Sequence, residues 1–147
     1  MKNIKPKLID LFKGGYCTPQ IARIASTLKE PSSTIHYNIK KLENEGAIKA
    51  YKAVFDYEKI NEGFCVYVLV NISPEYYNTP IAEELSKLEE VESAATIAGE
   101  WDIILKIRTK NQNEYYDILK KHLLPKGVTK TLTLTTLKDI KTNYVFL

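Results

Sequence analysis

The segment PSSTIHYNIKKLENEG, residues 31–46, carries the clearest helical pattern near the start of the chain. Ile35, Ile39 and Leu42 recur at spacings of four and three residues, which places them in one stripe of a helix. Gly46 follows where a helix commonly ends in a left-handed residue. The pattern predicts an amphipathic helix with a narrow buried stripe and a wide outward face.

The outward face of this helix carries groups that suit nucleic acid. At about 100° per residue, the side opposite the stripe collects hydroxyls, an aromatic ring, two cations and an amide. They are Ser33, Tyr37, Lys40, Lys41 and Asn44, with His36 on the flank. Glu43 and Glu45 lie toward the margins of this face. Such a face contacts phosphates and base edges, so we interpret the segment as a recognition helix. Taken alone, a solvated helix that is basic by chance explains the segment about equally well.

Two shorter helical segments precede the recognition helix. Their apolar residues at helical spacing are Leu8, Leu11 and Phe12, then Ile21, Ala22, Ile24, Ala25 and Leu28. Gly14-Gly15 is predicted to end the first, and Thr18-Pro19 to cap and open the second. Either Ser32 or Glu30 caps the third, depending on whether Pro31 lies outside it. The order of the three helices is that of a helix-turn-helix unit.

Charge and periodicity both change near residue 50, which predicts two small domains. Residues 1–50 carry nine Lys and Arg against four Asp and Glu, and residues 51–147 carry twelve against fourteen. The net charge of +3 therefore combines a basic module with a slightly acidic one. The predicted parts are a DNA-binding helix-turn-helix domain over 1–50, a connecting strand and linker over 51–63, and a second domain over 64–147.

Strand patterns dominate the rest of the chain. The predicted strands cover residues 47–56, 64–72, 91–98, 101–109 and 131–137. We interpret the first as a wing or connecting arm, followed by a polar turn over 56–63. Gly99-Glu100 is interpreted as the turn of a hairpin.

Two amphipathic helices alternate with these strands. Thr79 and Pro80 predict the cap and first position of a helix over 79–90. Asn113 predicts the cap of a second helix, which Pro125 ends. The order predicts a ferredoxin-like βαββαβ domain, and the whole chain is classed as α+β. Because two helices cover one face of a four-stranded sheet, the other face is left for dimerisation.

The composition argues against several function classes. Cys17 and Cys65 are isolated, and the only histidines are His36 and His122, so we expect no metal site, disulfide or cofactor. No catalytic spacing or phosphate-cradling glycine loop occurs, so we expect no enzyme. The apolar run 64–70 is too short to span a bilayer, and no apolar segment follows the first lysines. The protein is therefore expected to be soluble and intracellular.

Three stretches, in order and at their spacing, resemble the Lrp/AsnC family of prokaryotic transcription regulators, also called feast/famine regulatory proteins. They are SSTIHYNIKKLENEGAIKAYKAVFD (32–56), VESAATIAGEWDIILKIRT (91–109) and GVTKTLTLTTLKDIK (127–141). The resemblance implies a cytoplasmic homodimer that binds double-stranded DNA. It also implies further assembly to tetramers or octamers, and an effector, usually an amino acid, bound between dimers.

Two sets of site residues follow. The predicted DNA contacts are Ser32, Ser33, Thr34, His36, Tyr37, Lys40 and Lys41, with the two lysines on phosphates. The resemblance implies effector contacts from a loop and the last strand, at Gly99, Glu100, Trp101, Asp102, Thr131 and Thr133. Gly99 lets a ligand approach the backbone, Asp102 suits an ammonium, and threonine hydroxyls suit a carboxylate. On chemistry alone, these are also ordinary turn and strand residues.

Two positions depart from the family pattern. Asn38 stands where the family commonly has Arg, so a phosphate or turn contact of that Arg is missing. Lys29 stands where a Gly usually separates the second and third helices. The first helix is also shorter than usual. The rival interpretation is a protein-interaction adaptor, or an amino-acid-sensing regulatory subunit, that does not bind DNA.

Overall fold

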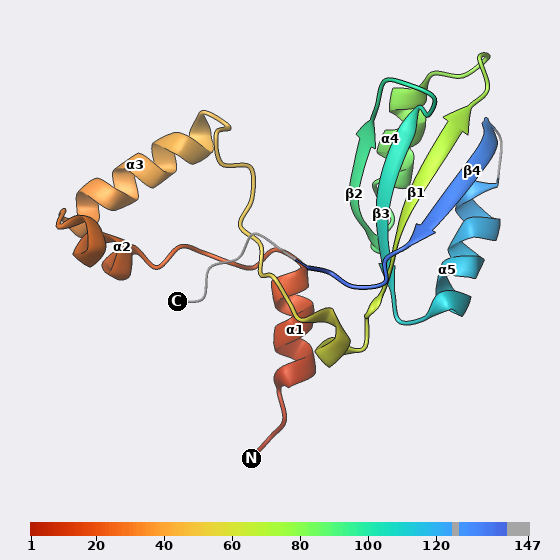
Figure 1. Ribbon diagram of the computed structural model, residues 1–147. Helices are drawn as coiled ribbons and strands as arrows, with labels where there is room; N and C mark the ends of the chain where they lie inside the picture. The colour runs from red at the N-terminus through yellow and green to blue at the C-terminus, as the bar shows by residue number, and fades with distance from the viewer. Residues whose placement is uncertain (125–126, 141–147) are drawn as a thin grey trace. The chain divides into compact units, whose positions relative to one another are not determined.

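The computed structural model describes residues 1–124 and 127–140, and the chain divides into two units, Met1–Val54 and Phe55–Leu147 (Figure 1). The first is helical and the second is built on a sheet. In the part of the chain that is described, no helix is long and apolar enough to cross a membrane. The same residues contain no group of three His, Cys, Asp or Glu side chains arranged to hold a metal ion.

The helical unit contains α1 (Lys5–Lys13), α2 (Ile21–Leu28) and α3 (Ser32–Asn44). Its buried residues are Ala25 on α2 and Ile35 on α3, where these two helices pack together. The predicted opening of α2 at Thr18-Pro19 is wrong, because the helix begins two residues later, after Gln20. Pro31 lies outside α3 as its N-cap residue and no side chain caps the helix, so neither alternative cap is used.

The predicted strand over 47–56 is absent, because the structure gives these residues no regular hydrogen-bonded partner. A strand requires a neighbour for its backbone N–H and C=O groups, which alternating side chains alone do not supply. The polar turn predicted after it contains a 3-10 helix, η1 (Tyr57–Ile60).

The sheet unit has the predicted βαββαβ order. Its elements are β1 (Phe64–Ile72), α4 (Asn78–Leu85), β2 (Val91–Thr96), β3 (Ile103–Thr109), α5 (Gln112–Ile118), the π-helical turn η2 (Leu119–Leu123) and β4 (Val128–Thr135). The four antiparallel strands lie in the order β2-β3-β1-β4. The predicted ferredoxin-like α+β fold is confirmed.

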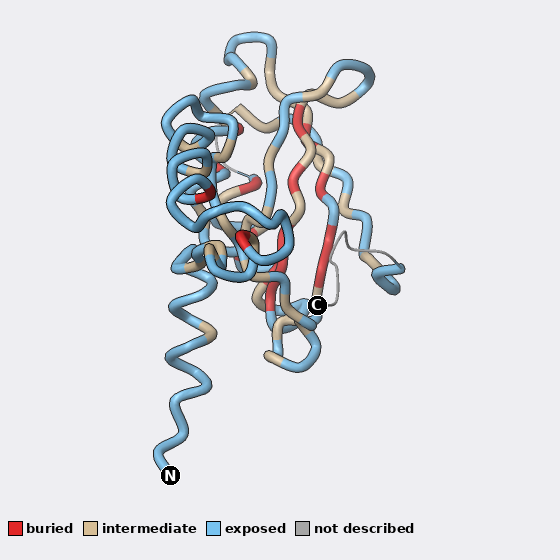
Figure 2. The backbone as a smooth tube through the Cα atoms, turned by 90° about the vertical axis from the view of Figure 1, so that its left-hand side faces the viewer, coloured by how far each residue is buried: buried red, intermediate tan, exposed pale blue. Residues whose placement is uncertain are grey.

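The core lies between the sheet and the helices α4 and α5, which cover the same sheet face (Figure 1). Figure 2 shows the buried positions concentrated along the strands. The buried core residues are Val66, Val68 and Val70 of β1, Ile103, Leu105 and Ile107 of β3, Ala82 and Leu85 of α4, Tyr115 and Ile118 of α5, and Leu123 of η2. Alternation along β1 and β3 turns one set of side chains into this core.

The opposite sheet face carries the other set of side chains. The register aligns Tyr67 with Leu134 and Leu69 with Leu132, and Ile104 pairs with Leu69 from β3. Tyr67, Leu132 and Leu134 are 37%, 41% and 48% exposed. We call these five residues the open face; it is an apolar strip that the described chain does not cover.

Several predicted boundaries in this unit are wrong. Helix α4 begins at Asn78, which places Thr79 inside it, and ends at Leu85 instead of residue 90. Asn111 caps α5, because its side-chain oxygen accepts the Glu114 N–H at 3.0 Å, and the predicted cap Asn113 lies within the helix. The last strand covers 128–135 in place of 131–137. The predicted helix stop at Pro125 lies outside the described residues.

Candidate functional site

The outward face of α3 is exposed along its length. Of the predicted apolar stripe, Ile35 is buried and Ile39 is half-buried where α3 packs on α2, while Leu42 is 42% exposed. The predicted DNA-contacting side chains Ser32, Ser33, Thr34, His36, Tyr37, Lys40 and Lys41 are all exposed, and Tyr37 is 69% exposed. The structure therefore brings this set together on one accessible helix surface.

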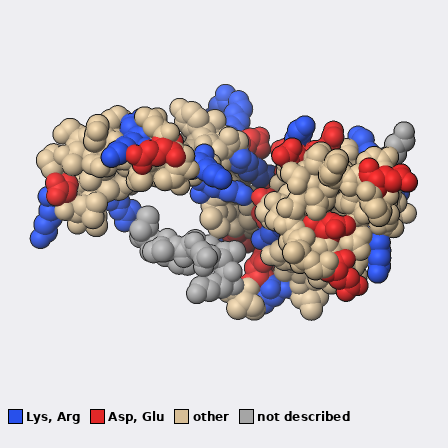
Figure 3. Space-filling model, turned by 90° about the horizontal axis from the view of Figure 1, so that it is seen from above, with Lys and Arg blue, Asp and Glu red and all other residues tan. Residues whose placement is uncertain are grey.

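Both lysines of this surface are paired with glutamates of the same helix end. Lys40 Nζ lies 2.9 Å from Glu43 Oε2, and Lys41 Nζ lies 3.9 Å from Glu45 Oε1. The Tyr51 hydroxyl donates to Glu43 Oε1 at 3.1 Å, which holds that glutamate in place. Figure 3 shows basic and acidic side chains next to one another on this helical unit.

The pair of Lys40 and Glu43 shifts the pKa of both its members. The hydrogen bond and charge of Glu43 raise the pKa of Lys40, and the hydrogen bond from Lys40 lowers the pKa of Glu43. The pairs are exposed, and exposed ion pairs contribute little to stability. A phosphate can therefore replace a glutamate as the partner of either lysine.

Asn38, the departure from the family pattern, turns back onto its own helix. Its Nδ2 donates to the Thr34 backbone oxygen at 2.8 Å. The side-chain NH2 group of Asn38 therefore finds its hydrogen-bond acceptor within α3.

The second candidate site is the loop between β2 and β3, residues 97–102. Gly99 has a φ of 133°, a backbone conformation that residues with a side chain rarely adopt. A Cβ built at Gly99 meets no atom within 4 Å. The glycine is thus required by the backbone conformation, and the space above it is open.

Asp102 ties this loop to the end of β1. Its Oδ2 accepts the Ile72 N–H at 2.8 Å, and its own N–H donates to the Val70 oxygen at 3.1 Å. Its backbone oxygen accepts the Ile97 N–H at 2.9 Å. The carboxylate is therefore half-buried and already holds one backbone donor, while Oδ1 makes no hydrogen bond to the described residues.

The threonines of β4 lie on the helix-facing side of the sheet. Thr131 pairs with Val70 and Thr133 with Val68, both core residues. The Thr133 hydroxyl is hydrogen-bonded to the hydroxyl of Tyr115, and burial raises the pKa of that tyrosine. The Thr133 hydroxyl therefore already has a hydrogen-bond partner in the same chain.

Trp101 contacts Lys130, a β4 residue on the sheet face that the helices do not cover. Lys130 Nζ is 5.0 Å from the centroid of the Trp101 ring, and Lys130 pairs with Asn71, on the side opposite Thr131. The six predicted effector residues thus divide between a loop and strand positions that face the helices. The assignment of these six residues stays a prediction.

Asn71 is a polar residue at this end of β1 that was not predicted from the sequence. Its side-chain oxygen Oδ1 is buried and has no hydrogen-bond partner among the described residues. A buried acceptor without a partner is uncommon in a folded protein. In the sequence it is one polar residue in a strand, and nothing there distinguishes it.

A charge cluster around the buried Arg108, at the other end of β3, was not predicted either. Arg108 Nε lies 2.9 Å from Glu92 Oε1, and Lys106 Nζ lies 3.2 Å from Glu92 Oε2. Asp139 Oδ2 is 3.6 Å from Arg108 Nη2, and the guanidinium carbon is 3.8 Å from the centroid of the Tyr57 ring. Burial, with the charge of Glu92 next, raises the pKa of Tyr57 to about 12. These residues are far apart in sequence, so no local pattern identifies the cluster.

Comparison with known proteins extends these observations. The sequence model of the Lrp/AsnC ligand binding domain matches residues 65–146. An uncharacterised HTH-type transcriptional regulator of Pyrococcus furiosus is 36% identical over 82% of this chain and 83% of its own length. The HTH-type transcriptional regulator FL11 of Pyrococcus horikoshii is 30% identical over 96% of this chain and 92% of its own.

A solved structure resembles most of the chain. It is a transcriptional regulator in complex with L-Met from Neisseria meningitidis, with a TM-score of 0.73 and 25% sequence identity. The match covers 90% of this chain and 86% of that one.

Proposed function

The chain belongs to the Lrp/AsnC family of transcription regulators, and on this premise we propose that it binds DNA in a sequence-dependent way through α3. Proteins of this family regulate transcription and are not enzymes. The observation that carries the proposal is the exposed face of α3, where hydroxyls, Tyr37 and two lysines are accessible together. Tyr37 and Ser33 contact base edges in the major groove, while Lys40 and Lys41 exchange their glutamate partners for phosphates.

The open face supports a homodimer as the DNA-binding species. Two sheets packed face to face bury such apolar strips against each other. A two-fold dimer presents two copies of α3, which reach successive major grooves when they stand about 34 Å apart.

The second domain of the proposed regulator binds a small effector, and an amino acid is the proposed class. The Neisseria meningitidis relative is a complex with L-Met, which supports this class. The free Oδ1 of Asp102 suits an ammonium group, and the open space above Gly99 admits a ligand to the backbone. An effector changes the affinity for DNA only if it binds two states of the protein with different affinities. These are two assembly states or two DNA-binding states.

DNA binding is tested by fluorescence anisotropy on a duplex from the protein's own promoter, across a range of salt concentrations. Lys40→Ala should reduce the salt slope by about one per subunit, since one phosphate contact is lost. Tyr37→Ala should reduce the preference for the promoter over random duplex while keeping the salt slope.

Lys110→Ala, which removes an exposed lysine of the sheet unit, is the matched control and should bind as wild type does. Unaltered binding in both α3 variants contradicts the assignment of this helix. Absence of salt-dependent retention on nonspecific DNA favours the adaptor interpretation instead.

The effector is tested by thermal shift with a panel of amino acids that includes L-Met. Asp102→Asn is the informative variant, because the amide oxygen still accepts the Ile72 N–H while the charge is lost. Its melting temperature without ligand should stay near that of wild type, and its ligand-dependent shift should disappear. A shift of equal size in wild type and Asp102→Asn contradicts the role of Asp102.

A further inference from the structure

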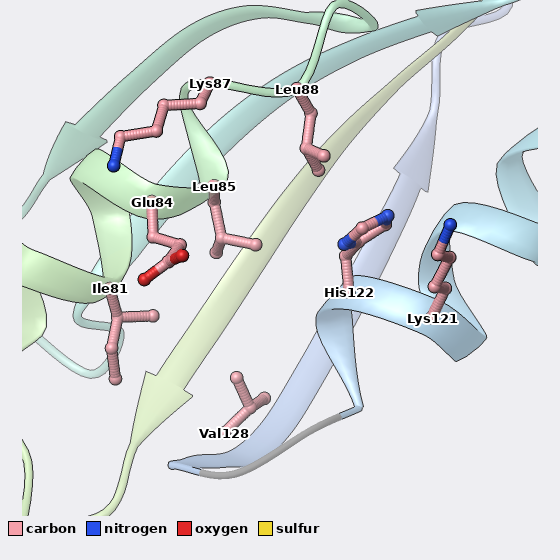
Figure 4. Close-up of a pocket in the computed structure, with 8 residues that line it drawn as sticks. All are labelled: Ile81, Glu84, Leu85, Lys87, Leu88, Lys121, His122 and Val128. Atoms are coloured by element: carbon pink, nitrogen blue, oxygen red, sulfur yellow. The ribbon is translucent and has the colours of Figure 1, made fainter.

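A groove opens on the helix-covered side of the sheet unit, and none of the predicted DNA-binding or effector-binding residues lines it. It lies between α4 with its following turn and the π-helical turn η2, and its volume is about 630 Å³. Figure 4 shows its lining, which consists of Ile81, Glu84, Leu85, Lys87, Leu88, Lys121, His122 and Val128. Sites for small organic ligands commonly enclose roughly 300–1,000 Å³, so this groove is of sufficient size.

The floor of the groove is aliphatic and continuous with the core. Leu85 is buried in the core, and Ile81, Leu88 and Val128 are half-buried residues packed against it. In Figure 4 the Leu85 and Leu88 side chains extend from the α4 side toward the space in front of His122. No Phe, Tyr or Trp side chain is among the described residues that line the groove. Such a floor favours a flexible aliphatic group over a flat ring.

The rim on the η2 side offers unpaired donors. Lys121 is exposed, and neither it nor His122 forms an ion pair or side-chain hydrogen bond with the described residues. The neighbouring Lys120 differs, because its Nζ lies 3.5 Å from Asp117 Oδ1 and 4.4 Å from the Tyr116 ring centroid. Lys121 and His122 stand next to each other at the groove mouth (Figure 4).

The charges around the groove favour an anion. Within the described lining, Lys87 and Lys121 are the cations and Glu84 is the one carboxylate, which leaves a positive balance before His122 is counted. Glu84 and Lys87 both belong to the α4 side, so the η2 side of this lining has donors and no acid. An anionic head group therefore fits beside Lys121 and His122.

The backbone that carries these donors is itself unusual. Residues 119–123 form a π-helical turn directly after α5. Turns of this kind are rare and occur frequently at functional sites. Here the turn lies where Lys121 and His122 meet the aliphatic floor.

We propose that this groove binds a monocarboxylate with an unbranched aliphatic tail, of the medium-chain fatty acid type. The carboxylate lies between Lys121 Nζ and the imidazole of His122, and the tail covers Leu88, Leu85 and Ile81. This site is separate from the Asp102 loop, so it adds a second ligand to the chain and does not depend on the proposed amino-acid effector.

The test uses the full-length protein and decanoate as the probe, measured by isothermal titration calorimetry. Decanoate should bind saturably, and each methylene removed, in octanoate and then hexanoate, should weaken binding about two- to fourfold. Lys121→Gln should weaken decanoate binding about two- to fivefold, because one exposed charge contact is lost. Lys120→Gln is the matched control and should leave the affinity unchanged, since its side chain is paired outside the groove.

The position is tested by photo-crosslinking with a decanoate analogue that carries a diazirine on its tail, followed by peptide mapping. Label on the peptides that contain Ile81–Leu88 or Lys121–His122, competed by decanoate, supports the groove. Label spread over the open face at Leu132 and Leu134 overturns it. Equal affinities in Lys121→Gln and Lys120→Gln overturn the head-group assignment.

Two further variants distinguish a fatty-acid site in the groove from the effector loop and from a contact between copies. Asp102→Asn should bind decanoate as wild type does, and loss of decanoate binding in that variant contradicts a separate site. Leu88→Glu should abolish decanoate binding without changing the mass in solution. If wild type does not bind decanoate and Leu88→Glu lowers the mass, the groove is a contact between copies and the proposal is wrong.

Discussion

Lys29 adopts a φ of 55° and a ψ of 40°, the left-handed conformation, at the end of α2. The resemblance described from the sequence implies a Gly at this position, and Lys29 takes the backbone conformation that a Gly adopts more readily. The turn keeps its geometry, because the Glu30 N–H still bonds to the Ala25 oxygen at 3.0 Å. A side chain in this conformation is destabilising by roughly 1–2 kcal/mol.

We expect Lys29→Gly to stabilise the helical unit by about 0.5–1 kcal/mol, because the gain in the folded state exceeds the added freedom of the unfolded chain. Native-state hydrogen exchange of α2 and α3 amides measures the change. Lys29→Ala keeps the Cβ and serves as the control without a gain. Equal protection in the glycine and alanine variants contradicts the prediction.

Glu92 is the residue on which the charge cluster around Arg108 depends. Burial by itself raises its pKa, but the hydrogen bond and charge of Arg108, together with Lys106, outweigh burial and hold the pKa of Glu92 below its ordinary value of 4.5. The side chain of Arg108 is 5% exposed, so it needs this partner. Since the folded state favours the ionised carboxylate, the contribution is present above the ordinary pKa and is lost as the pH falls.

Glu92→Gln should destabilise the sheet unit by about 1–3 kcal/mol at pH 7, because Arg108 loses its nearest negative charge and keeps only the more distant carboxylate of Asp139 among the described residues. Urea unfolding measures the difference, which should shrink as the pH falls below 4.5 toward the folded pKa of Glu92. Asp56→Asn, which breaks the exposed pair with Lys59, should change stability little at either pH. A difference that does not depend on pH contradicts the assigned cause.

At the scale of elements, helix α5 shows how a cap is chosen by geometry. Asn111 has extended backbone angles and accepts the Glu114 N–H, while Glu114 Oε2 accepts the Lys110 N–H at 3.0 Å. This reciprocal arrangement satisfies two backbone donors at the start of the helix. Asn113 is an equally good capping residue type, but it lies one residue inside the helix.

Asn111→Ala should destabilise the sheet unit by about 1 kcal/mol, since one backbone donor of α5 loses its acceptor. Asn113→Ala has the same chemistry two positions away and should have an effect of less than about 0.5 kcal/mol. The midpoint of urea unfolding at constant m distinguishes them. A larger loss at Asn113 than at Asn111 contradicts the observed helix start.

At the scale of the whole molecule, the open face is the apolar surface that a single described chain leaves exposed to water. Tyr67, Leu132 and Leu134 are large apolar side chains on a sheet surface, where a second sheet removes them from water. The proposed spacing of two α3 helices on DNA depends on that second copy.

Leu134→Glu should shift the mass in solution to that of one chain, 16.8 kDa, and weaken promoter binding, because a charge at the centre of the interface is not compensated. Leu124→Glu alters a leucine that is 58% exposed away from the sheet and should keep the wild-type mass. Light scattering measures both. A wild-type mass in Leu134→Glu contradicts dimerisation through this face.

At the scale of elements, the predicted bounds were accurate where a local residue pattern sets them and less accurate where a contact with another residue sets them. β1 was predicted to the residue, because its run of β-branched and aromatic side chains is interrupted sharply at both ends. The starts of α2, α4 and α5 were each wrong by two residues, because a cap depends on which side chain reaches a free N–H. The strand over 47–56 failed for a different reason, since a strand exists only with a neighbour.

The candidate sites divide in the same way. The face of α3 follows from helical periodicity, so its exposed residues were identified from sequence spacing alone. The threonines of β4 were found as an alternating set, but their turn toward the helices, and the occupation of Thr133 by Tyr115, depend on the pairing of β4 with β1.

The sequence by itself determined the kinds and order of the elements, the basic face of α3 and the family, because these depend on periodicity and composition within short windows. Only the tertiary structure decided which sheet face each alternating side chain meets, that Glu92 pairs with the buried Arg108, and that a groove opens beside Lys121. Those features join residues that are distant in the chain, and strand register and helix packing, which no local pattern contains, bring them together.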